Sequence, residues 1–317
     1  MSASLRLFAP ADYAALCDIQ NAVYSEASVT VEEVRLADDL RDPMCKHRRW
    51  MVEMEERPVA WGEYTQRIHK YHPHKFFLNL FVLPTYQNQG IGSKLYTHML
   101  EALQPFEPVQ IRTQTQEDQS QSVRFLQQRG FREEQRKWES RLDLTTFDLG
   151  PYLEVEQRLS EQGIVLKTLE ELAGDPERDR KLYALDWQIR QDVPATEPRS
   201  PISFELFCAR FLYHPEIVPE AFIVAVHNGE YVGLSFMGAQ PSSKLISTGL
   251  TGTLRSYRRM GIATALKLRG IRYAQQHGYT VLRTVNDALN APMLSINMRM
   301  GFVKHEQLAI LYFVKDC

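Results

Sequence analysis

The sequence lacks any apolar run of the ~18 residues or more that a membrane-spanning helix needs. It also lacks an excess of charge of one sign, because 37 basic and 39 acidic residues give a formal net charge of −2. Such a balance does not attract nucleic acid or an anionic membrane surface, so we expect neither as a partner. The first twelve residues lack the apolar core of a secretion signal, so we expect a cytoplasmic protein.

Cysteine is scarce, and its spacing excludes the usual metal-binding patterns. The four cysteines are scattered and never form the close pairs that bind metals. They are Cys17, Cys45, Cys208 and Cys317. We therefore expect reduced thiols and no metal centre. Three histidines between His69 and His74 suggest a metal only loosely, and a polar loop is the better interpretation.

The composition and length predict an ordinary globular chain of two domains. Apolar residues make up 44% and charged residues 24% of the sequence, as in soluble proteins. A chain of 317 residues is long enough for two domains of common size, each with its own core.

One stretch occurs twice and organises the chain. Residues 82–95 read VLPTYQNQGIGSKL, and residues 253–266 read TLRSYRRMGIATAL. Gly90 and Gly261 are 171 residues apart, and the later pairs Gly130-Phe131 and Gly301-Phe302 keep the same offset. Over fifty aligned positions ten residues are identical, whereas chance predicts roughly three. We infer a duplicated domain, because the period is far too long for a solenoid repeat.

The sequence pattern of each half predicts a mixture of helices and strands. In the first half, strands are expected over 4–8, 48–53, 59–67, 76–82, 109–113 and 131–142, the last of these being the final strand of that half. In the second half, the strands are expected over 164–169, 221–227, 231–238, 245–254, 280–285 and 302–314, the last closing that domain. Gly150-Pro151 marks the boundary, which predicts domains 1–150 and 151–317. The fold class is therefore α+β, with a mixed and mostly antiparallel sheet flanked by helices in each half.

The repeated turn has the features of an anion cradle at the start of a helix. The first N–H groups of a helix have no partner within it and carry a partial positive charge. Gly90 and Gly92 leave the backbone open to a diphosphate, and Arg258 and Arg259 add charge in the second copy. A Walker A loop is excluded by the spacing of Gly-Ile-Gly-Ser-Lys. A dinucleotide fingerprint is excluded because a third glycine is lacking.

The pattern (Gln/Arg)-x-x-Gly-x-(Gly/Ala), after a strand and before a helix, resembles the acyl-CoA signature of the GNAT superfamily of N-acyltransferases. The Gly-Phe pairs are similar to the second part of that signature. The resemblance covers essentially the whole chain as two tandem GNAT-like domains. It implies acetyl-CoA as cofactor, with its diphosphate on each turn and its pantetheine arm along the preceding strand. The cofactor-binding residues implied are Phe81, Val82, Leu83, Gln87, Asn88, Gln89, Gly90, Ile91, Gly92 and Ser93, with Thr253, Leu254, Arg258, Arg259, Met260, Gly261, Ile262, Ala263, Thr264, Asn286, Asn290 and Asn297.

The residues that many GNAT enzymes use as acid and base are missing. Leu126 and Asn297 stand where a tyrosine often protonates the leaving thiolate. Neither strand before a turn carries the usual glutamate base, and Asn79 lies in the first of them. Tyr312 and Asn297 are the catalytic candidates that remain, although a core or surface tyrosine is the plainer interpretation of Tyr312. Glu63 is a weaker candidate for the base, and a solvated strand face explains it better.

The resemblance implies an N-acetyltransferase that moves an acetyl group from acetyl-CoA to a primary amine of a small molecule. The second half is favoured as the active one, because its turn has two arginines and its last helix has three nearby asparagines. Two alternatives stay open. In the first alternative, one domain is catalytic and the other is a degenerate CoA-binding or scaffold module. In the second, the acceptor is a peptide or protein amine. The acceptor itself is not encoded in any motif of the sequence.

Overall fold

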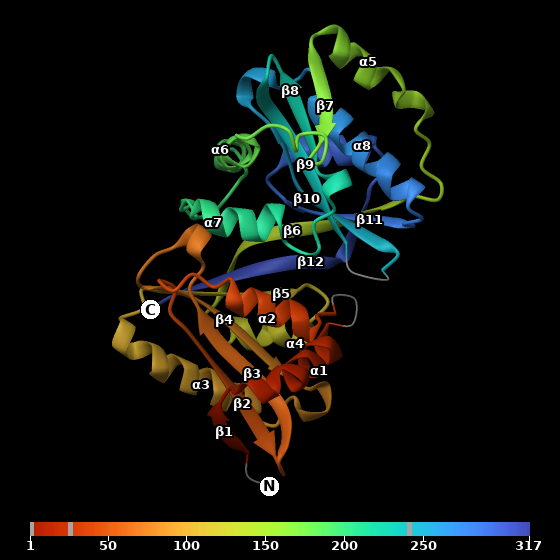
Figure 1. Cartoon of the computed structure of the whole chain (residues 1–317). Coiled ribbons are helices and arrows are strands. Elements are labelled where there is room, and N and C mark those ends of the chain that lie inside the picture. Colours follow the sequence, from red (N-terminus) through yellow and green to blue (C-terminus); the bar gives the residue numbers. More distant parts are fainter. Residues whose placement is uncertain (1–2, 25–27, 240–242) are drawn as a thin grey trace.

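Figure 1 shows a computed structural model that describes residues 3–24, 28–239 and 243–317. In the first half the strands are β1 (Ser4–Leu7), β2 (His47–Met54), β3 (Arg57–Thr65), β4 (Lys75–Val82), β5 (Gln110–Gln116) and β6 (Arg132–Asp143). The helices are α1 (Tyr13–Val23), α2 (Val31–Asp39), α3 (Ile91–Leu103) and α4 (Ser120–Gln127).

The second half repeats this order. Its strands are β7 (Ile164–Thr168), β8 (Ile223–His227), β9 (Glu230–Ala239), β10 (Leu245–Thr253), β11 (Val281–Asp287) and β12 (Val303–Asp316). Its helices are α5 (Glu154–Glu161), α6 (Arg178–Gln191), α7 (Phe204–Phe207), α8 (Ile262–Gln276) and α9 (Ala291–Arg299). These elements confirm the α+β class and a mixed, mostly antiparallel sheet with helices on its faces.

Local sequence signals account for several of these boundaries. Thr30 caps α2, because its side chain accepts from Glu33 N while the Glu33 carboxylate accepts from Thr30 N. Asn228 and Gly229 both have positive φ, as a tight two-residue hairpin turn between β8 and β9 requires. Met99 and Leu103 on one face of α3 are fully buried in the core of the first half.

The strands form one continuous sheet, and the last strand of each half is exchanged. The order is β1-β2-β3-β4-β5-β12-β6-β11-β10-β9-β8-β7. We expected residues 131–142 to be the final strand of the first half and residues 302–314 to close the second, but the structure exchanges their places. β12 lies between β5 and β6, and β6 pairs with β11 and β12 (Figure 1).

The exchange makes each core depend on the other half of the chain. Leu311 and Phe313 of β12 are buried in the core beneath α3, whereas Leu142 of β6 is buried in a core with α8. Burying one such side chain stabilises a fold by roughly 1.5–3 kcal/mol. Neither half therefore keeps its full core when it is separated from the other.

Two pairs of parallel strands open like a V, once in each half. β4 and β5 pair only from Lys75 to Phe77, and β10 and β11 pair only from Leu245 to Ser247. Beyond these short ladders, the edges of β4 and β10 that face the gap pair with no strand among the described residues. Unpaired strand edges present backbone donors and acceptors to whatever enters the gap.

Candidate functional site

A cleft of about 360 Å³ lies in the first half, where β4 and β5 diverge. Its walls come from the end of β4, from β5, from α4 and from the turn that begins α3. Seven of the residues expected to bind the cofactor line it: Phe81, Val82, Gln87, Asn88, Gly90, Gly92 and Ser93. Three others do not, because Leu83 and Ile91 pack in the core and the Gln89 amide bonds to Thr85 O.

The turn before α3 exposes backbone donors at the mouth of this cleft. Gly90 has φ +82°, a conformation that glycine adopts without strain. The first intrahelical hydrogen bond of α3 is donated by Lys94 N to Gly90 O, so the N–H groups of Ile91, Gly92 and Ser93 have no partner within the helix. A Cβ at Gly92 would lie 3.6 Å from Phe125 and Val82, inside the space that the cleft leaves free.

Arg129 supplies a fixed positive charge beside the turn. Its guanidinium donates to Ser93 Oγ at 2.7 Å and to Phe125 O at 3.0 Å, and it stacks on the Phe125 ring. Sequence analysis missed this residue. The repeat offers one signal, since the position of Arg129 in the second half is the buried, uncharged Met300.

The first cleft is also lined by a tyrosine that follows the last residue of α1 and that no sequence motif indicates. Tyr24 contacts Phe81 of β4 edge to face, and its hydroxyl lies 3.3 Å from Thr115 Oγ1 of β5. Burial raises the pKa of Tyr24, so its hydroxyl keeps its proton at neutral pH. Asn79 and Leu126 line the same cleft.

In the corresponding turn of the second half, Arg258 is already in an ion pair, whereas Arg259 is exposed. Gly261 has φ +89° and precedes α8, as the repeat predicts. Arg258 and Arg255 both form ion pairs with Asp192, which follows α6. Of the other residues expected to bind the cofactor here, Thr253 ends β10, and Leu254 and Ile262 pack inside the protein. Arg259 has positive φ, and Met260 is exposed. Ala263 and Thr264 are half-buried in the first turn of α8.

A second cavity of about 280 Å³ lies where the two halves meet, and we call it the junction cavity. Asn286 and Asn290 line it, and Asn297 donates to Asn286 Oδ1 at 2.7 Å. Asn290 also caps α9 by accepting from Met293 N. Tyr312 lines this cavity from β12, with its hydroxyl accepting from Lys137 Nζ at 3.2 Å. None of the residues from Arg258 to Ala263 lines it.

Lys267 of α8 is a buried cation at the junction cavity. Its side chain is 1% exposed, and its Nζ has no hydrogen-bond partner among the described residues. Burial alone lowers its pKa to about 8. The ammonium lies 5.0 Å from the centroid of the Phe302 ring, which compensates it in part. A buried ammonium without a counterion still destabilises the folded state, because the charge has lost its hydration.

Replacing Lys267 with methionine is expected to stabilise the protein at pH 7. The lowering of its pKa from 10.5 to about 8 corresponds to about 3 kcal/mol of folding free energy lost at neutral pH. The gain should shrink between pH 8 and 10.5, because the folded protein then releases this proton before the unfolded chain does. Urea unfolding at pH 7 and pH 10 measures both effects. Lys315→Met, in a half-buried lysine near Tyr96, is the control, and an equal gain there would contradict the prediction.

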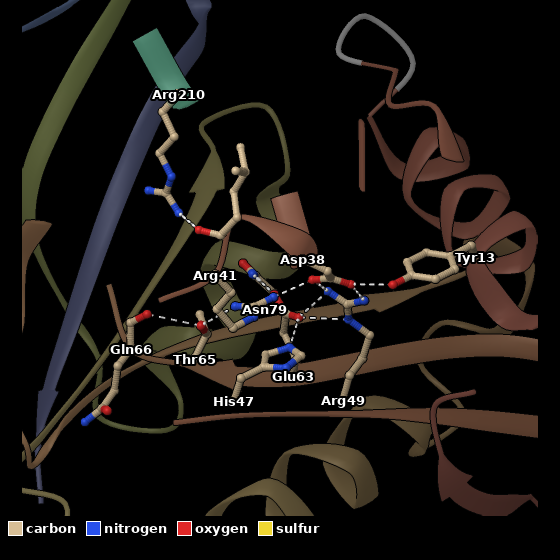
Figure 2. A network of polar contacts seen from close by, with 11 residues as sticks. Tyr13, Asp38, Arg41, His47, Arg49, Glu63, Thr65, Gln66, Asn79 and Arg210 are labelled. Carbon is tan, nitrogen blue, oxygen red and sulfur yellow. Dashed lines mark hydrogen bonds and ion pairs between the residues drawn. The ribbon is translucent and has the colours of Figure 1, made fainter. Parts of the chain in front are cut away.

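A network of charged side chains lies on the face of β2, β3 and β4 below α2 (Figure 2). Glu63 Oε2 accepts from Arg49 Nε at 2.8 Å and lies 2.9 Å from His47 Nε2, while Glu63 Oε1 accepts from Asn79 Nδ2 at 2.7 Å. Arg49 also forms an ion pair with Asp38. The expectation that Glu63 lies on a solvated face is wrong, because the side chain is buried.

The network fixes Glu63 in its ionised form. Burial would raise the pKa of Glu63, but the hydrogen bond with His47, the charge of Arg49 and the Asn79 amide together lower it to about 2. Both carboxylate oxygens are occupied, so Glu63 holds these strands together and is a poor proton acceptor. Arg210 from the second half donates to Leu40 O beside this network (Figure 2).

Two classes of feature are absent from the described part of the chain. Its four cysteines are free, and no three His, Cys, Asp or Glu side chains in it are grouped to hold a metal ion. Among the helices described, none is both long and apolar enough to cross a membrane.

Comparison with known proteins gives one family. The sequence pattern described as "Acetyltransferase (GNAT) family" matches residues 13–131 and again residues 180–302. None of the curated proteins compared with the chain matches it in sequence.

Solved structures resemble the whole chain. A GCN5-related N-acetyltransferase from Sphaerobacter thermophilus has 18% identity and a TM-score of 0.73, with 99% of this chain and 95% of that chain covered. A tandem GNAT protein from the clavulanic acid biosynthesis pathway has 17% identity and a TM-score of 0.75, covering 99% and 98%. At these identities the likeness concerns the fold, including its tandem arrangement.

Proposed function

Because the chain belongs to the GNAT family of acetyltransferases, we propose that it transfers an acetyl group from acetyl-CoA to a primary amine of a small molecule. The proposal places the cofactor in the cleft of the first half. The observation that carries it is the continuity of this cleft, which runs from the start of α3 to the unpaired edge of β4.

The residues present fit acetyl-CoA in charge and shape. The N–H groups at the start of α3, together with Arg129, would hold the diphosphate, because a helix N-terminus and a guanidinium both favour anions. Gly92 leaves room for that group at the mouth. The free edge of β4 from Leu78 to Val82 would pair with the amides of the pantetheine arm. When bound, acetyl-CoA supplies an activated thioester carbonyl for attack by the amine.

Tyr24 is our candidate for the proton donor to the thiolate. Its hydroxyl lies in the cleft at the position where β4 and β5 diverge, and Thr115 orients it. Leu126 cannot serve, and Glu63 is saturated by its partners. Asn79 lines the cleft and donates to Glu63, the centre of the network of charged side chains. It would therefore fix the wall of the cleft without transferring a proton.

This proposal revises the preference for the second half. The two arginines of its turn favour that half, but Arg258 forms an ion pair with Asp192 and only Arg259 stays exposed without one among the described residues. The buried Lys267 stands beside the diverging strands there, where the first half has Tyr96. The second half contributes β12 to the sheet of the first. These features support the alternative in which the second half is a scaffold module with respect to acetyl transfer.

The proposal predicts that the full-length protein binds acetyl-CoA and releases thiol from it in the presence of an amine. Calorimetry should give one strong site, and Arg129→Met should weaken it roughly tenfold, because one charge-assisted contact is lost.

A panel of small amines, polyamines, aminoglycosides and peptides identifies the acceptor class. Thiol release only with peptides would favour a peptide or protein acceptor. Absence of acetyl-CoA binding would overturn the proposal.

A further inference from the structure

The junction cavity has an excess of positive charge. Five cationic side chains line it: Arg67, Lys70, Lys137, Arg199 and Lys267. Asp287 is the one carboxylate among the residues that line it, and its oxygens accept from the Gln135 amide and from Leu289 N. Glu197 lies in a neighbouring pocket, where it forms ion pairs with Lys75 and Arg112. Glu197 therefore offsets the charges of Arg67 and Lys70 in part, and Asp186 does the same for Arg199, whereas no carboxylate among the described residues offsets the charge of Lys267.

Buried polar atoms without partners lie at this cavity. Lys267 Nζ and Arg199 Nε have none among the described residues, although both side chains line the cavity. Asn297 Oδ1 has none either, and Asn297 bonds directly to Asn286 on the cavity wall. A fully buried ammonium without a counterion is costly, so its presence points to a partner that the protein itself does not supply.

We propose that the junction cavity binds a small anionic molecule through a carboxylate or phosphate group, held by Lys267 with Arg67 and Lys70. Cations in a recessed cavity of low dielectric attract an anion far more strongly than the same cations on an open surface. The cavity volume of about 280 Å³ suits a metabolite of a few carbon atoms. A cavity of this volume is too small to enclose a nucleic acid or a folded protein.

The anion site is separate from the cleft of the first half. The two cavities share no lining residue, and the junction cavity lies on the other side of the exchanged strands. Its ligands come from both halves, because Arg67 and Lys70 follow β3 whereas Lys267 belongs to α8. A bound anion would therefore link the two halves, and its binding does not depend on acetyl transfer.

The test uses the full-length protein at pH 7, titrated by calorimetry with succinate, inorganic phosphate and the neutral succinamide. We expect saturable binding of one succinate or one phosphate per chain and none of succinamide. The tighter of the two anions assigns the group as carboxylate or phosphate. If neither anion binds more strongly than succinamide, the proposal is wrong.

Variants assign the site. Lys267→Met should weaken anion binding by at least about tenfold, since a charge-assisted hydrogen bond is lost, and Lys70→Gln should weaken it as well. Lys315→Met, which removes a half-buried lysine outside the cavity, should leave the affinity unchanged. Saturating acetyl-CoA should not displace the anion. Competition with acetyl-CoA, or unchanged affinity in both cavity variants, would overturn the site, whereas failure of acetyl-CoA to bind would leave it intact.

Discussion

Replacing Gly92 with leucine is expected to weaken acetyl-CoA binding roughly 100-fold and to reduce turnover to a similar degree. Gly92 lies in the first turn of α3, and a Cβ there would sit in ordinary contact with Phe125 and Val82. The Gly92→Leu protein should therefore fold without backbone strain, and the leucine side chain would fill the mouth of the cleft. Filling a close-packed space costs about 1–3 kcal/mol, and the higher figure corresponds to about 100-fold in affinity.

The repeat offers a matched control for this substitution. Ala263 occupies the position of Gly92 in the second half, at the same place in α8. Ala263→Leu should leave acetyl-CoA binding unchanged if the first half holds the cofactor. Calorimetry and thermal unfolding of both variants separate a blocked site from a misfolded protein. The opposite pattern, with loss only in Ala263→Leu, would return the cofactor to the second half.

Glu63→Gln is expected to lower the free energy of unfolding by about 3–5 kcal/mol at pH 7. The carboxylate is buried between His47, Arg49 and Asn79, so its removal leaves a buried guanidinium with only Asp38 (Figure 2). Breaking one side of a buried ion pair has a cost of this size. Glu117→Gln removes one of the two carboxylates paired with Arg136, a half-buried one, and should change stability by less than about 1 kcal/mol because Glu133 stays in place.

The same group predicts how stability depends on pH. The pKa of Glu63 is lowered to about 2 in the folded protein, from an ordinary value of 4.5. The ionised Glu63 therefore adds about 3 kcal/mol to the free energy of unfolding above pH 4.5, and this contribution is lost as the pH falls towards 2. Chemical unfolding between pH 7 and pH 3 should show a steeper loss in the parent protein than in Glu63→Gln. Parallel curves would contradict the assignment.

The repeated turn could be predicted from sequence because its signals are local. A strand end, a polar turn and a glycine at a helix start follow one another within a few residues, and the same order recurs 171 residues later. The exchange of β6 and β12 could not be predicted in this way. The two strands occupy equivalent positions in the repeat, so the same alternation suits pairing within a half and pairing across halves.

The site residues that sequence analysis missed come from distant elements. Tyr24 reaches the first cleft from just after α1, and Arg129 reaches it from the end of α4. Neither belongs to a motif, and their roles depend on how helices pack on the sheet. Lys267 could not be expected at a buried position either, because unpaired lysine is rarely found in a core. Conflicts of this kind between residue type and environment are expected at functional sites.

The position of β12 has a consequence for synthesis on the ribosome. β5 pairs with β4 on one edge, but its other edge acquires its neighbour only when residues 303–316 have emerged, and Gln110 then bonds to Asp316. At roughly 5–20 residues per second, the 200 residues after β5 take about 10–40 seconds to translate. Throughout that interval the nascent chain presents an unpaired β5 edge, which is a template for aggregation. The native pairing of β5 with β12 therefore cannot form until residues 303–316 have been made.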